Sequence, residues 1–558
     1  MKRISLNGSL ICAAAMLASA CYTSAESHQP DRAAGCEPEL LAALGQWADV
    51  GFSGTVAIEG GGRYCRAAFG SADVAAGTAN TDATVFGIGS VSKAFTAAAI
   101  LDLVDADAFA LDDRAGDLLP GLGGPAAEAT VEQLLLHTSG IEGSHGADHR
   151  PLDRDEAIAA ISALESAFPP GTDYLYSNAG YSLLALIIDE QSGSSYREYL
   201  DEQILTLDSG HMGGFWDGEP APAGPRAIGY TEGEPAPETG GFAGPHWAMA
   251  GNGDLAMTAA ELGAGTAALF TGELLSPEAV DMLMSTGFDH GDGTTELPGW
   301  VSIDPELLGV PVIAASGGGG DTGHSAVTVW LPETATTIAI ASNTDEVLPD
   351  ELLEVLLPAV VTGEPMAVPD ERAEVDPAEL QARAGVYALD SGSTLTVAAE
   401  DDGLLVTAEG ADAVAAMFGS DDFTVEDAAA HEDAVLALLD GESAVGRAER
   451  DAIEAEIGPI TGVDLAGTAD EDGELRTYVR VHGEDGDMLV WYALDDQGQI
   501  AALEYDAGPP AFTLVPMGEG EYRPDEPIAA EAAVEVSFQD DLMTVTGPDG
   551  AVDARRTA

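Results

Sequence analysis

Residues 86–100 read FGIGSVSKAFTAAAI and place a serine and a lysine three positions apart where an apolar helix begins. Residues with this spacing lie on one helix face about a turn apart, so the amine of Lys93 can reach the hydroxyl of Ser90. The first turn of a helix also carries unpaired N–H groups and the positive end of the dipole, which favour negative charge beside Ser90. The alanine-rich continuation predicts a buried helix, and burial lowers the pKa of a lysine. The stretch therefore predicts a serine nucleophile with a lysine as its base.

The lysine is unusual in this composition. Of the 20 Lys and Arg residues only Lys2 and Lys93 are lysines. A surface lysine on an ordinary helix is the alternative, but a chain that uses arginine for almost all of its positive charge has little need of lysine there. Arginine cannot act as the base, because its pKa stays above 12.

The first 20 residues are typical of an export signal. Lys2 and Arg3 precede an apolar run that is too short to span a membrane, and small residues follow it before Cys21. Two outcomes stay open, namely lipid attachment to Cys21, as in bacterial lipoproteins, or ordinary cleavage nearby. We therefore expect an exported protein, periplasmic or at the cell surface, which contacts the membrane only through that lipid if it is attached.

The four cysteines divide unevenly between these segments. Cys12 leaves with the signal and Cys21 is the lipidation candidate, so Cys36 and Cys65 remain as an even pair. A disulfide between them would join the first helix to an early strand, as is usual outside the cytoplasm. Two separate buried thiols are the alternative.

The charge of the chain is strongly negative. There are 97 acidic and 20 basic residues, with a formal net charge of −77, and the acidic residues are spread along the whole sequence. Because 46% of the residues are hydrophobic, the chain can still fill a core. In dilute buffer the carboxylates of such a protein repel one another strongly. Molar salt shortens the screening length to about 3 Å and so confines this repulsion to close neighbours. We expect a halophilic or marine source, and the charge argues against nucleic-acid binding.

A second chemical motif is YLYSNAGY at residues 174–181. Residues two apart in extended or turn backbone point the same way, so Tyr176 and Asn178 can share a cleft. A phenol whose pKa a nearby lysine lowers could pass a proton to and from Ser90, while the amide of Asn178 could hold both the lysine and a substrate carbonyl. An aromatic cluster in the core is the alternative, and it fits the flanking tyrosines better than Tyr176.

Histidines offer weaker candidates. His137 ends the short helical stretch LLLHTSG, where capping the helix and bonding a neighbouring loop is favoured over catalysis. His145 and His149 lie four apart in a Gly-rich loop without further ligands nearby, which is too little for a metal site. We expect no metal and no cofactor.

Together, SVSK at residues 90–93, YSN at 176–178 and the segment LLHTSG resemble the serine β-lactamase and penicillin-binding superfamily, in its branch of class C β-lactamases, D-Ala-D-Ala peptidases and esterases. The resemblance runs from about Ser53 to Asn343. It implies an α+β fold in which helices flank an antiparallel sheet and form a helical subdomain. It also implies a serine hydrolase that forms an acyl-enzyme with an ester or amide, and hence a small-molecule or peptide substrate.

The third motif of this superfamily departs from its usual form. In relatives a strand edge carries Lys or His, then Thr, Ser or Gly, then Gly, but the region VIAASGGGGDTGH at residues 312–324 has no Lys or His at the expected place. The matching position lies near Ser316, Gly317 and Gly318, which we expect to bind substrate. Backbone donors for an oxyanion can persist there, because glycine permits close approach. Recognition of a substrate carboxylate is put in doubt, and His324 is expected to be structural.

The chain outside this region suggests a second domain. We expect a hydrolase domain at residues 36–362, a linker at 363–383, and a small β-barrel-like domain at 384–558 with an α+β insertion at about 428–504.

A penicillin-binding or sensing protein with weak turnover is the alternative function, motivated by the altered third motif. An α/β-hydrolase is disfavoured, because the sequence lacks G-x-S-x-G.

Overall fold

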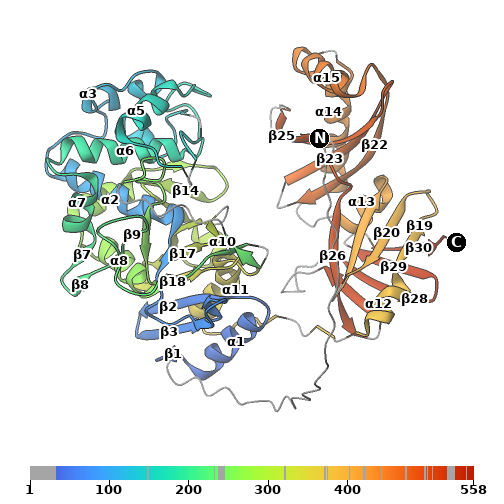
Figure 1. The fold of residues 1–558 in the computed structure, drawn as a ribbon, viewed down its shortest axis with the longest axis horizontal. Coiled ribbons are helices and arrows are strands. Elements are labelled where there is room, and N and C mark those ends of the chain that lie inside the picture. Colours follow the sequence, from blue (N-terminus) through green and yellow to red (C-terminus); the bar gives the residue numbers. More distant parts are fainter. Residues whose placement is uncertain are drawn as a thin grey trace, which may run out of the picture. The chain divides into compact units, whose positions relative to one another are not determined.

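The computed structural model describes residues 33–557, except 142, 148–149, 232, 237–244, 319–321, 370–371, 374, 401–402, 419–422, 442, 472–473, 495–497, 499, 506, 519, 525–533 and 548–549. The expected export signal and Cys21 lie outside the described residues. Contacts divide the chain into two compact units, one with residues up to 41 and 51–353, the other with 42–50 and 354–558. Figure 1 shows that each unit contains both helices and strands.

The first unit is built on a nine-stranded sheet in which each pair of neighbours is antiparallel. In spatial order the strands are β1 (Ala33–Ala34), β3 (Arg63–Phe69), β2 (Gly54–Gly60), β18 (Thr336–Ser342), β17 (Ser325–Leu331), β16 (Val312–Gly318), β15 (Trp300–Ile303), β14 (Thr294–Leu297) and β13 (Phe288–Asp289). Every residue of β17 and β18 is buried, which explains their nearly unbroken runs of apolar and small residues. The expected antiparallel sheet with flanking helices is confirmed.

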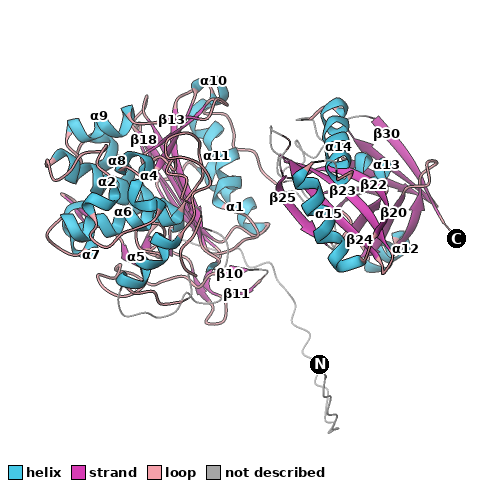
Figure 2. Cartoon of the chain, turned by 90° about the horizontal axis from the view of Figure 1, so that it is seen from above, coloured by secondary structure: helices cyan, strands magenta, loops and turns pink. Residues whose placement is uncertain are grey.

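Helices pack on this sheet and on one another. The helix α8 contacts β2, β17 and β18, while α2 lies against α6 and α9. Figure 2 shows α2, α4, α6 and α8 on one side of the strands. The helices of this unit are α2 (Ser92–Asp105), α3 (Ala115–Leu118), α4 (Val131–Leu135), α5 (Arg154–Ala163), α6 (Asn178–Gln191), α7 (Tyr196–Tyr199), α8 (Ala259–Thr271), α9 (Pro277–Ser285) and α10 (Pro305–Leu308), with helical turns η1 (Gly89–Val91), η2 (Pro125–Glu128) and η3 (Leu200–Ile204).

Short strands complete the first unit. A three-stranded sheet has the order β6 (Phe86–Gly87), β12 (Leu255–Met257), β9 (Gly214–Phe215). Its strand β6 leads directly into the nucleophile stretch. Three further pairs are β4 (Ser71–Asp73) with β5 (Thr78–Ala79), β7 (Thr206–Leu207) with β8 (Gly210–His211), and β10 (Tyr230–Thr231) with β11 (Glu234–Pro235).

The second unit contains a closed eight-stranded barrel. Its strands are β19 (Gly385–Ala388), β20 (Thr394–Ala399), β21 (Leu404–Glu409), β26 (Ala511–Gly518), β27 (Glu521–Pro524), β28 (Glu535–Gln539), β29 (Leu542–Gly547) and β30 (Gly550–Arg556), and β30 pairs with β19. Alternate residues such as Leu395 and Val397 on β20 are buried, as the alternating sequence predicts for a barrel wall.

An α+β segment is inserted between β21 and β26. It comprises α13 (Ala411–Phe418), α14 (Val425–Leu439), α15 (Ala444–Ile457) and the sheet of β22 (Ile460–Glu471), β23 (Glu474–Gly483), β24 (Asp487–Leu494) and β25 (Ile500–Tyr505). The segment thus begins earlier than the expected residue 428, because α13 precedes it. The helix α12 (Pro377–Arg383) occupies the end of the stretch expected as linker. Two more helices, α1 (Pro38–Asp49) and α11 (Pro349–Thr362), run across the division between the units.

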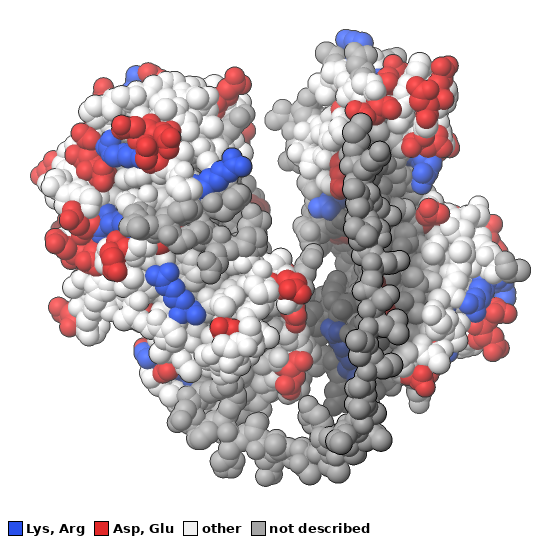
Figure 3. Space-filling view, in the orientation of Figure 1, with Lys and Arg blue, Asp and Glu red and all other residues white. Residues whose placement is uncertain are grey.

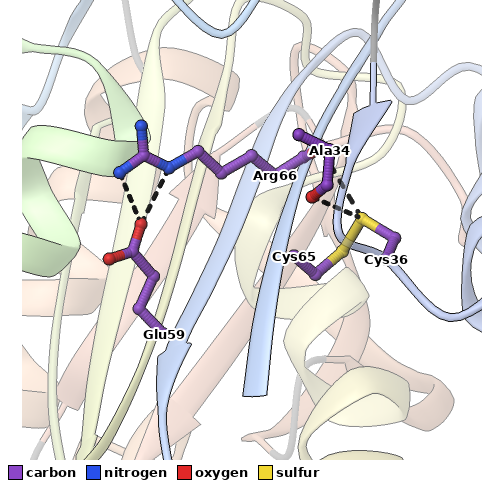
Figure 4. Close-up of a disulfide and its surroundings, with 5 residues drawn as sticks. All are labelled: Ala34, Cys36, Glu59, Cys65 and Arg66. Atoms are coloured by element: carbon purple, nitrogen blue, oxygen red, sulfur yellow. Dashed lines mark hydrogen bonds and ion pairs between the residues drawn. A yellow bond between two sulfur atoms is a disulfide. The ribbon is translucent and has the colours of Figure 1, made fainter. Parts of the chain in front are cut away.

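Cys36 and Cys65 form a disulfide in the first unit (Figure 4). Cys65 lies on β3. The next residue on this strand, Arg66, makes an ion pair with Glu59 on β2, with 2.6 Å between the charged atoms. The cross-link therefore fastens the start of the described chain to the sheet. Figure 3 shows acidic side chains distributed over both units, as the composition predicts.

Candidate active site

The nucleophile stretch folds as the turn η1 followed directly by α2, with Ser90 in the turn. Gly89 has φ +50°, and a Cβ there would lie 2.5 Å from the backbone nitrogen of Gly318, so glycine is required. Residues 92–101 of α2 are all buried, which explains why the helix is apolar on every side. The helix is therefore a rigid base that fixes Ser90 and Lys93 one turn apart.

Lys93 points back along the helix to the nucleophile. Its side chain is only 3% exposed, and Nζ donates a hydrogen bond to Ser90 Oγ over 2.8 Å. The same nitrogen donates to Asn178 Oδ1 over 2.8 Å and to the backbone oxygen of Asn252 over 3.0 Å. The predicted contact between serine and lysine is thus present, and the acceptors orient the amine toward Ser90.

Tyr176 is the second side chain in contact with the nucleophile. Its hydroxyl donates a hydrogen bond to Ser90 Oγ over 2.7 Å, and Lys93 Nζ lies 4.7 Å from the centre of its ring. Burial raises the pKa of Tyr176 and the carboxyl of Glu296 adds to that rise, while the hydrogen bond to Ser90 opposes it. The expectation of a lowered phenol pKa is therefore wrong, because desolvation outweighs the favourable contacts. The phenol is protonated at neutral pH and acts as a donor.

Asn178 reaches the site through the lysine. It opens α6, where Ser177 caps the helix and accepts a hydrogen bond from Gly180 N over 3.1 Å. The amide oxygen of Asn178 accepts from Lys93, which leaves the amide nitrogen as its remaining polar group. The expected convergence of residues 90, 93, 176 and 178 is present in the structure.

The strand β16 closes the site beside Ser90. A Cβ on Gly317 would lie 2.2 Å from the backbone nitrogen of Ser90, so the strand and the nucleophile turn are in direct backbone contact. Gly318 has φ +122°, a conformation that favours glycine. Residues 319–321 of the third motif lie outside the described residues.

His324 lines a second cavity, together with Trp216 and Arg197, whose lining does not include Ser90. Its side chain is 5% exposed, and burial lowers its pKa to about 4 while a hydrogen bond to the Ala227 backbone opposes the shift. The ring is therefore neutral and packs against Phe86 and Trp216, which agrees with the expected structural role.

His137 holds the segment that carries Tyr176. Its Nδ1 accepts a hydrogen bond from Ser177 N over 3.0 Å, and its backbone oxygen accepts from Leu175 N over 2.9 Å. The imidazole also lies 4.5 Å from the Tyr176 ring, centre to centre. Burial, helped by the charge of Lys93, lowers the pKa of His137 to about 3, so the ring is neutral. The predicted bond to a neighbouring loop is present, and it positions the phenol.

Glu296 is the residue of this site that the sequence analysis missed. It lies on β14 and is 6% exposed, and its Oε2 accepts a hydrogen bond from the Tyr174 hydroxyl over 3.3 Å. His137 Nε2 and His290 Nε2 lie 4.0 Å and 3.8 Å from its carboxylate oxygens. Burial raises the pKa of Glu296 to about 7, although Tyr174 and Lys93 both act to lower it.

One open cavity of about 310 Å³ is lined by Ser90, Lys93, His137, Tyr176 and Glu296. Its walls come from α2, the segment of Tyr174 and Tyr176, strands β14 to β17, and the first turn of α11. Ser90 and Lys93 lie in this lining, together with Glu296 and Asp350. A serine held by an amine and a phenol at the wall of such a cavity can attack a bound carbonyl carbon.

Two observations concern other kinds of site. The described residues hold no group of three or more His, Cys, Asp or Glu side chains placed to bind a metal ion. Within the described part of the chain, every helix is too short or too polar to span a lipid bilayer.

Comparison with a family model matches residues 46–359 to the beta-lactamase family. A putative penicillin-binding protein, PbpX of Bacillus subtilis, is 30% identical over 281 residues, which cover 49% of this chain and 70% of that protein. Penicillin-binding protein 4 of Amycolatopsis lactamdurans is 36% identical over 136 residues, 23% of this chain and 36% of that protein. A D-aminopeptidase of Cereibacter sphaeroides is 29% identical over 185 residues, 31% of this chain and 34% of that protein. The chain thus spans only about a third of the length of two of these relatives.

A solved structure supports the fold. The octameric penicillin-binding protein homologue from Pyrococcus abyssi superposes with a TM-score of 0.53 at 18% identity, over 91% of this chain and 98% of that one. At this identity the likeness concerns the fold alone. The family-model match over more than half of the chain, the shared fold and the arrangement of Ser90, Lys93 and Tyr176 agree with one another, and the chain belongs to the beta-lactamase family.

Proposed function

We propose that the chain hydrolyses an ester or amide through an acyl-enzyme formed on Ser90. The observation that carries this proposal is the pair of hydrogen bonds at Ser90 Oγ, one from Lys93 over 2.8 Å and one from Tyr176 over 2.7 Å. A nucleophilic hydroxyl needs a neighbouring base to remove its proton and a donor to supply one to the leaving group. The two contacts supply groups for both tasks.

The proposed acylation moves three protons and keeps the balance of charge. In the reactive form, Lys93 is a neutral amine that donates to Asn178 and Asn252 and accepts a hydrogen bond from Ser90. As Ser90 Oγ bonds to the carbonyl carbon, its proton passes to this amine. The Tyr176 hydroxyl gives its proton to the departing nitrogen or oxygen, and the Lys93 ammonium restores that proton to the phenol. In deacylation water takes the place of the leaving group, and the same groups transfer its protons in reverse.

The oxyanion of the intermediate would lie between the nucleophile turn and β16. The contact between Gly317 and the Ser90 nitrogen supports a site built from the Ser90 N–H and an N–H of the Gly317–Gly318 segment. Fixed backbone donors of this kind stabilise the charge that develops in the transition state. Asn178 would act here by orienting Lys93 and by offering its amide nitrogen to the substrate carbonyl.

The test is the hydrolysis of an activated ester by the full chain, in dilute buffer and at molar salt. Replacing Ser90 with alanine is expected to abolish turnover, whereas the same change at the exposed residue Ser209 should leave it unchanged. Mass spectrometry of the quenched wild-type reaction should show one acyl group on the peptide that contains Ser90. Full activity of the Ser90→Ala variant would refute the proposal.

A penicillin-binding or sensing protein with slow turnover is the second candidate. It is favoured by the altered β16 motif, because β16 contributes only Ala314, Ala315 and Ser316 to the cavity and therefore brings no cation into it. A fluorescent penicillin separates the two candidates. A stable label on Ser90 that is not released would favour the sensor, and rapid release of product would favour the hydrolase.

We also propose that the protein is exported. Support comes from the signal-like first 20 residues and from the disulfide between Cys36 and Cys65, since disulfides persist in oxidising compartments. Fractionation of cells that make the full chain should place it outside the cytoplasm. Replacing Cys21 with serine then distinguishes a lipid-anchored form, which would leave the membrane fraction, from an unanchored form, which would not change.

A further inference from the structure

The charges that line the active-site cavity are mostly negative. Among the described residues of its lining, Lys93 is the one Lys or Arg side chain, and it is engaged with Ser90 and Asn178. Two carboxyl groups, Glu296 and Asp350, face the same space. A substrate carboxylate would therefore meet carboxyl groups rather than a free cation in this cavity.

The two carboxyl groups lie in different surroundings. Asp350 is exposed in the first turn of α11, where it is hydrogen-bonded to Ser316. Glu296 is 6% exposed, and the groups against its oxygens are the phenol of Tyr174 and the imidazoles of His137 and His290. A buried carboxylate without a close, permanent counter-charge is costly, and an incoming cation would relieve that cost.

Aromatic rings complete these surroundings. Tyr174, Tyr176 and Trp300 line the cavity together with Glu296. Tyr174 also stacks on Phe288, with ring centres 5.9 Å apart. Ring faces attract ammonium groups, and their attraction adds to that of a neighbouring carboxylate. The cavity therefore combines the two kinds of group that bind an organic cation.

We propose that the cavity selects ester or amide substrates that carry an ammonium group, and that Glu296 is the residue that sets this preference. The inference rests on the proposed serine-hydrolase function and names its substrate class. In relatives, the Lys or His of the third motif favours substrates that carry a carboxylate. A preference for an ammonium group would be the opposite. Asp350, at the rim, contributes less because it is exposed to water and salt.

The first experiment compares three amino-acid p-nitroanilides that differ only at the amino group, which is free, acetylated or succinylated. Both enantiomers are assayed at about pH 7.5, where Glu296 is mostly ionised and much of the free amine is protonated. We expect kcat/KM for the ammonium substrate to exceed that for the acetylated one by about tenfold or more. The succinylated substrate, which carries a carboxylate, should be the poorest.

Single substitutions test whether Glu296 causes the preference for ammonium substrates. Replacing Glu296 with glutamine keeps the shape of the side chain and should reduce the ratio between ammonium and acetylated substrates to near one, whatever its effect on the absolute rates. The exposed Glu278 on α9 is the matched control, and its glutamine variant should keep the full ratio. Asp350→Asn, at an exposed position, should lower the ratio only slightly.

A binding experiment measures the preference for the ammonium group without turnover. In the Ser90→Ala variant, calorimetry with the same three compounds should give the tightest binding for the free amine, and Glu296→Gln in that background should remove the difference. Equal affinities, or tighter binding of the succinylated compound, would overturn the inference. Failure of the wild-type protein to turn over any of the three would count against the proposed function instead, and the binding order would still decide the specificity.

Discussion

Ser90 receives hydrogen bonds from two donors of different chemistry, an ammonium or amine and a phenol. The bond from the phenol strengthens as negative charge develops on the serine oxygen, while Lys93, the proposed base, takes up the serine proton. The two donors are held by unrelated means. Lys93 is fixed by burial in α2, whereas Tyr176 is 42% exposed and depends on the His137 contacts to its neighbours.

Removal of the phenol hydroxyl alone should therefore separate catalysis from folding. Tyr176→Phe is expected to lower kcat for an activated ester by about 10²- to 10⁴-fold, because a proton-transfer group is lost. The melting temperature should hardly change, since the ring and its packing on His137 remain. Steady-state kinetics and thermal unfolding measure the two effects, and a variant with wild-type kcat would contradict the proton route.

The preference for cationic substrates should depend on pH through Glu296. The titratable groups that face its carboxyl are Lys93, His137, Tyr174, Tyr176, Tyr181 and His290. The pKa of Glu296 is raised to about 7, so the group is mostly neutral at pH 6 and mostly ionised at pH 8. His137, with a pKa of about 3, stays neutral over this range.

Ionisation of Glu296 strengthens the attraction for a cation, so the preference should increase with rising pH. The measurement is kcat/KM for a trimethylammonium ester, whose charge does not titrate, divided by kcat/KM for its uncharged tert-butyl analogue. We expect this ratio to rise between pH 6 and pH 8 with a midpoint near 7 and to become flat in Glu296→Gln. A ratio that falls with pH in the wild-type protein would contradict this role.

At the scale of secondary structure, the site depends on a close approach between the turn η1 and the strand β16. Gly89 and Gly317 face each other across this contact, and neither has room for a side chain. The strand is in turn fixed by its antiparallel pairing with β17, whose residues are all buried. A rigid sheet thus sets the position of the proposed oxyanion donors.

Substitution of Gly317 should disturb this contact. A methyl group there would lie 2.2 Å from Ser90 N, so one of the two backbones must move. We expect Gly317→Ala to reduce kcat by more than 10²-fold and to destabilise the first unit by about 1–3 kcal/mol, the usual cost of overpacking. Gly486→Ala is the matched control, because no atom lies within 4 Å of its added methyl and its backbone is unstrained. Equal behaviour of the two variants in kinetics and urea unfolding would exclude the contact as a catalytic element.

Local sequence patterns predicted part of this arrangement. The serine–lysine spacing fixed one side of the site because both residues lie on one helix, and the spacing of Tyr176 and Asn178 identified the other. Glu296 could not be found in this way, since β14 has four residues and the chain has 97 acidic ones. The raised pKa of Tyr176 could not be predicted from the sequence either. It results from burial of the phenol and from the nearby Glu296 carboxyl, and tertiary packing sets both.

At the scale of the whole molecule, the net charge of −77 opposes compaction of both units. The barrel strands could be predicted from the sequence, because apolar and polar residues alternate along strands such as β20. The earlier start of the insertion was not, since α13 is an eight-residue helix that packs on β22, a strand remote in sequence. Local patterns specify the strands, but the limits of an insertion depend on such distant contacts.

The charge predicts how stability responds to salt. Screening of the repulsion among carboxylates should raise the melting temperature as KCl increases from low concentration to molar levels. NaCl at equal ionic strength should give a similar rise, because screening depends on ionic strength rather than on the cation. Differential scanning calorimetry of the full chain measures the shift, and a constant or falling melting temperature would contradict a salt-adapted protein.

The disulfide between Cys36 and Cys65 has a mechanical consequence. Any tension applied upstream of residue 36, for example by a tether at the amino terminus, is transmitted by a covalent bond to the middle of β3. The two-residue strand β1 lies upstream of the cross-link, so such tension can detach it from β3, but the load then passes through the disulfide into the seven-residue strand β3. The cross-link would therefore stop unravelling at residue 36, before it extends into the helix α1 that follows.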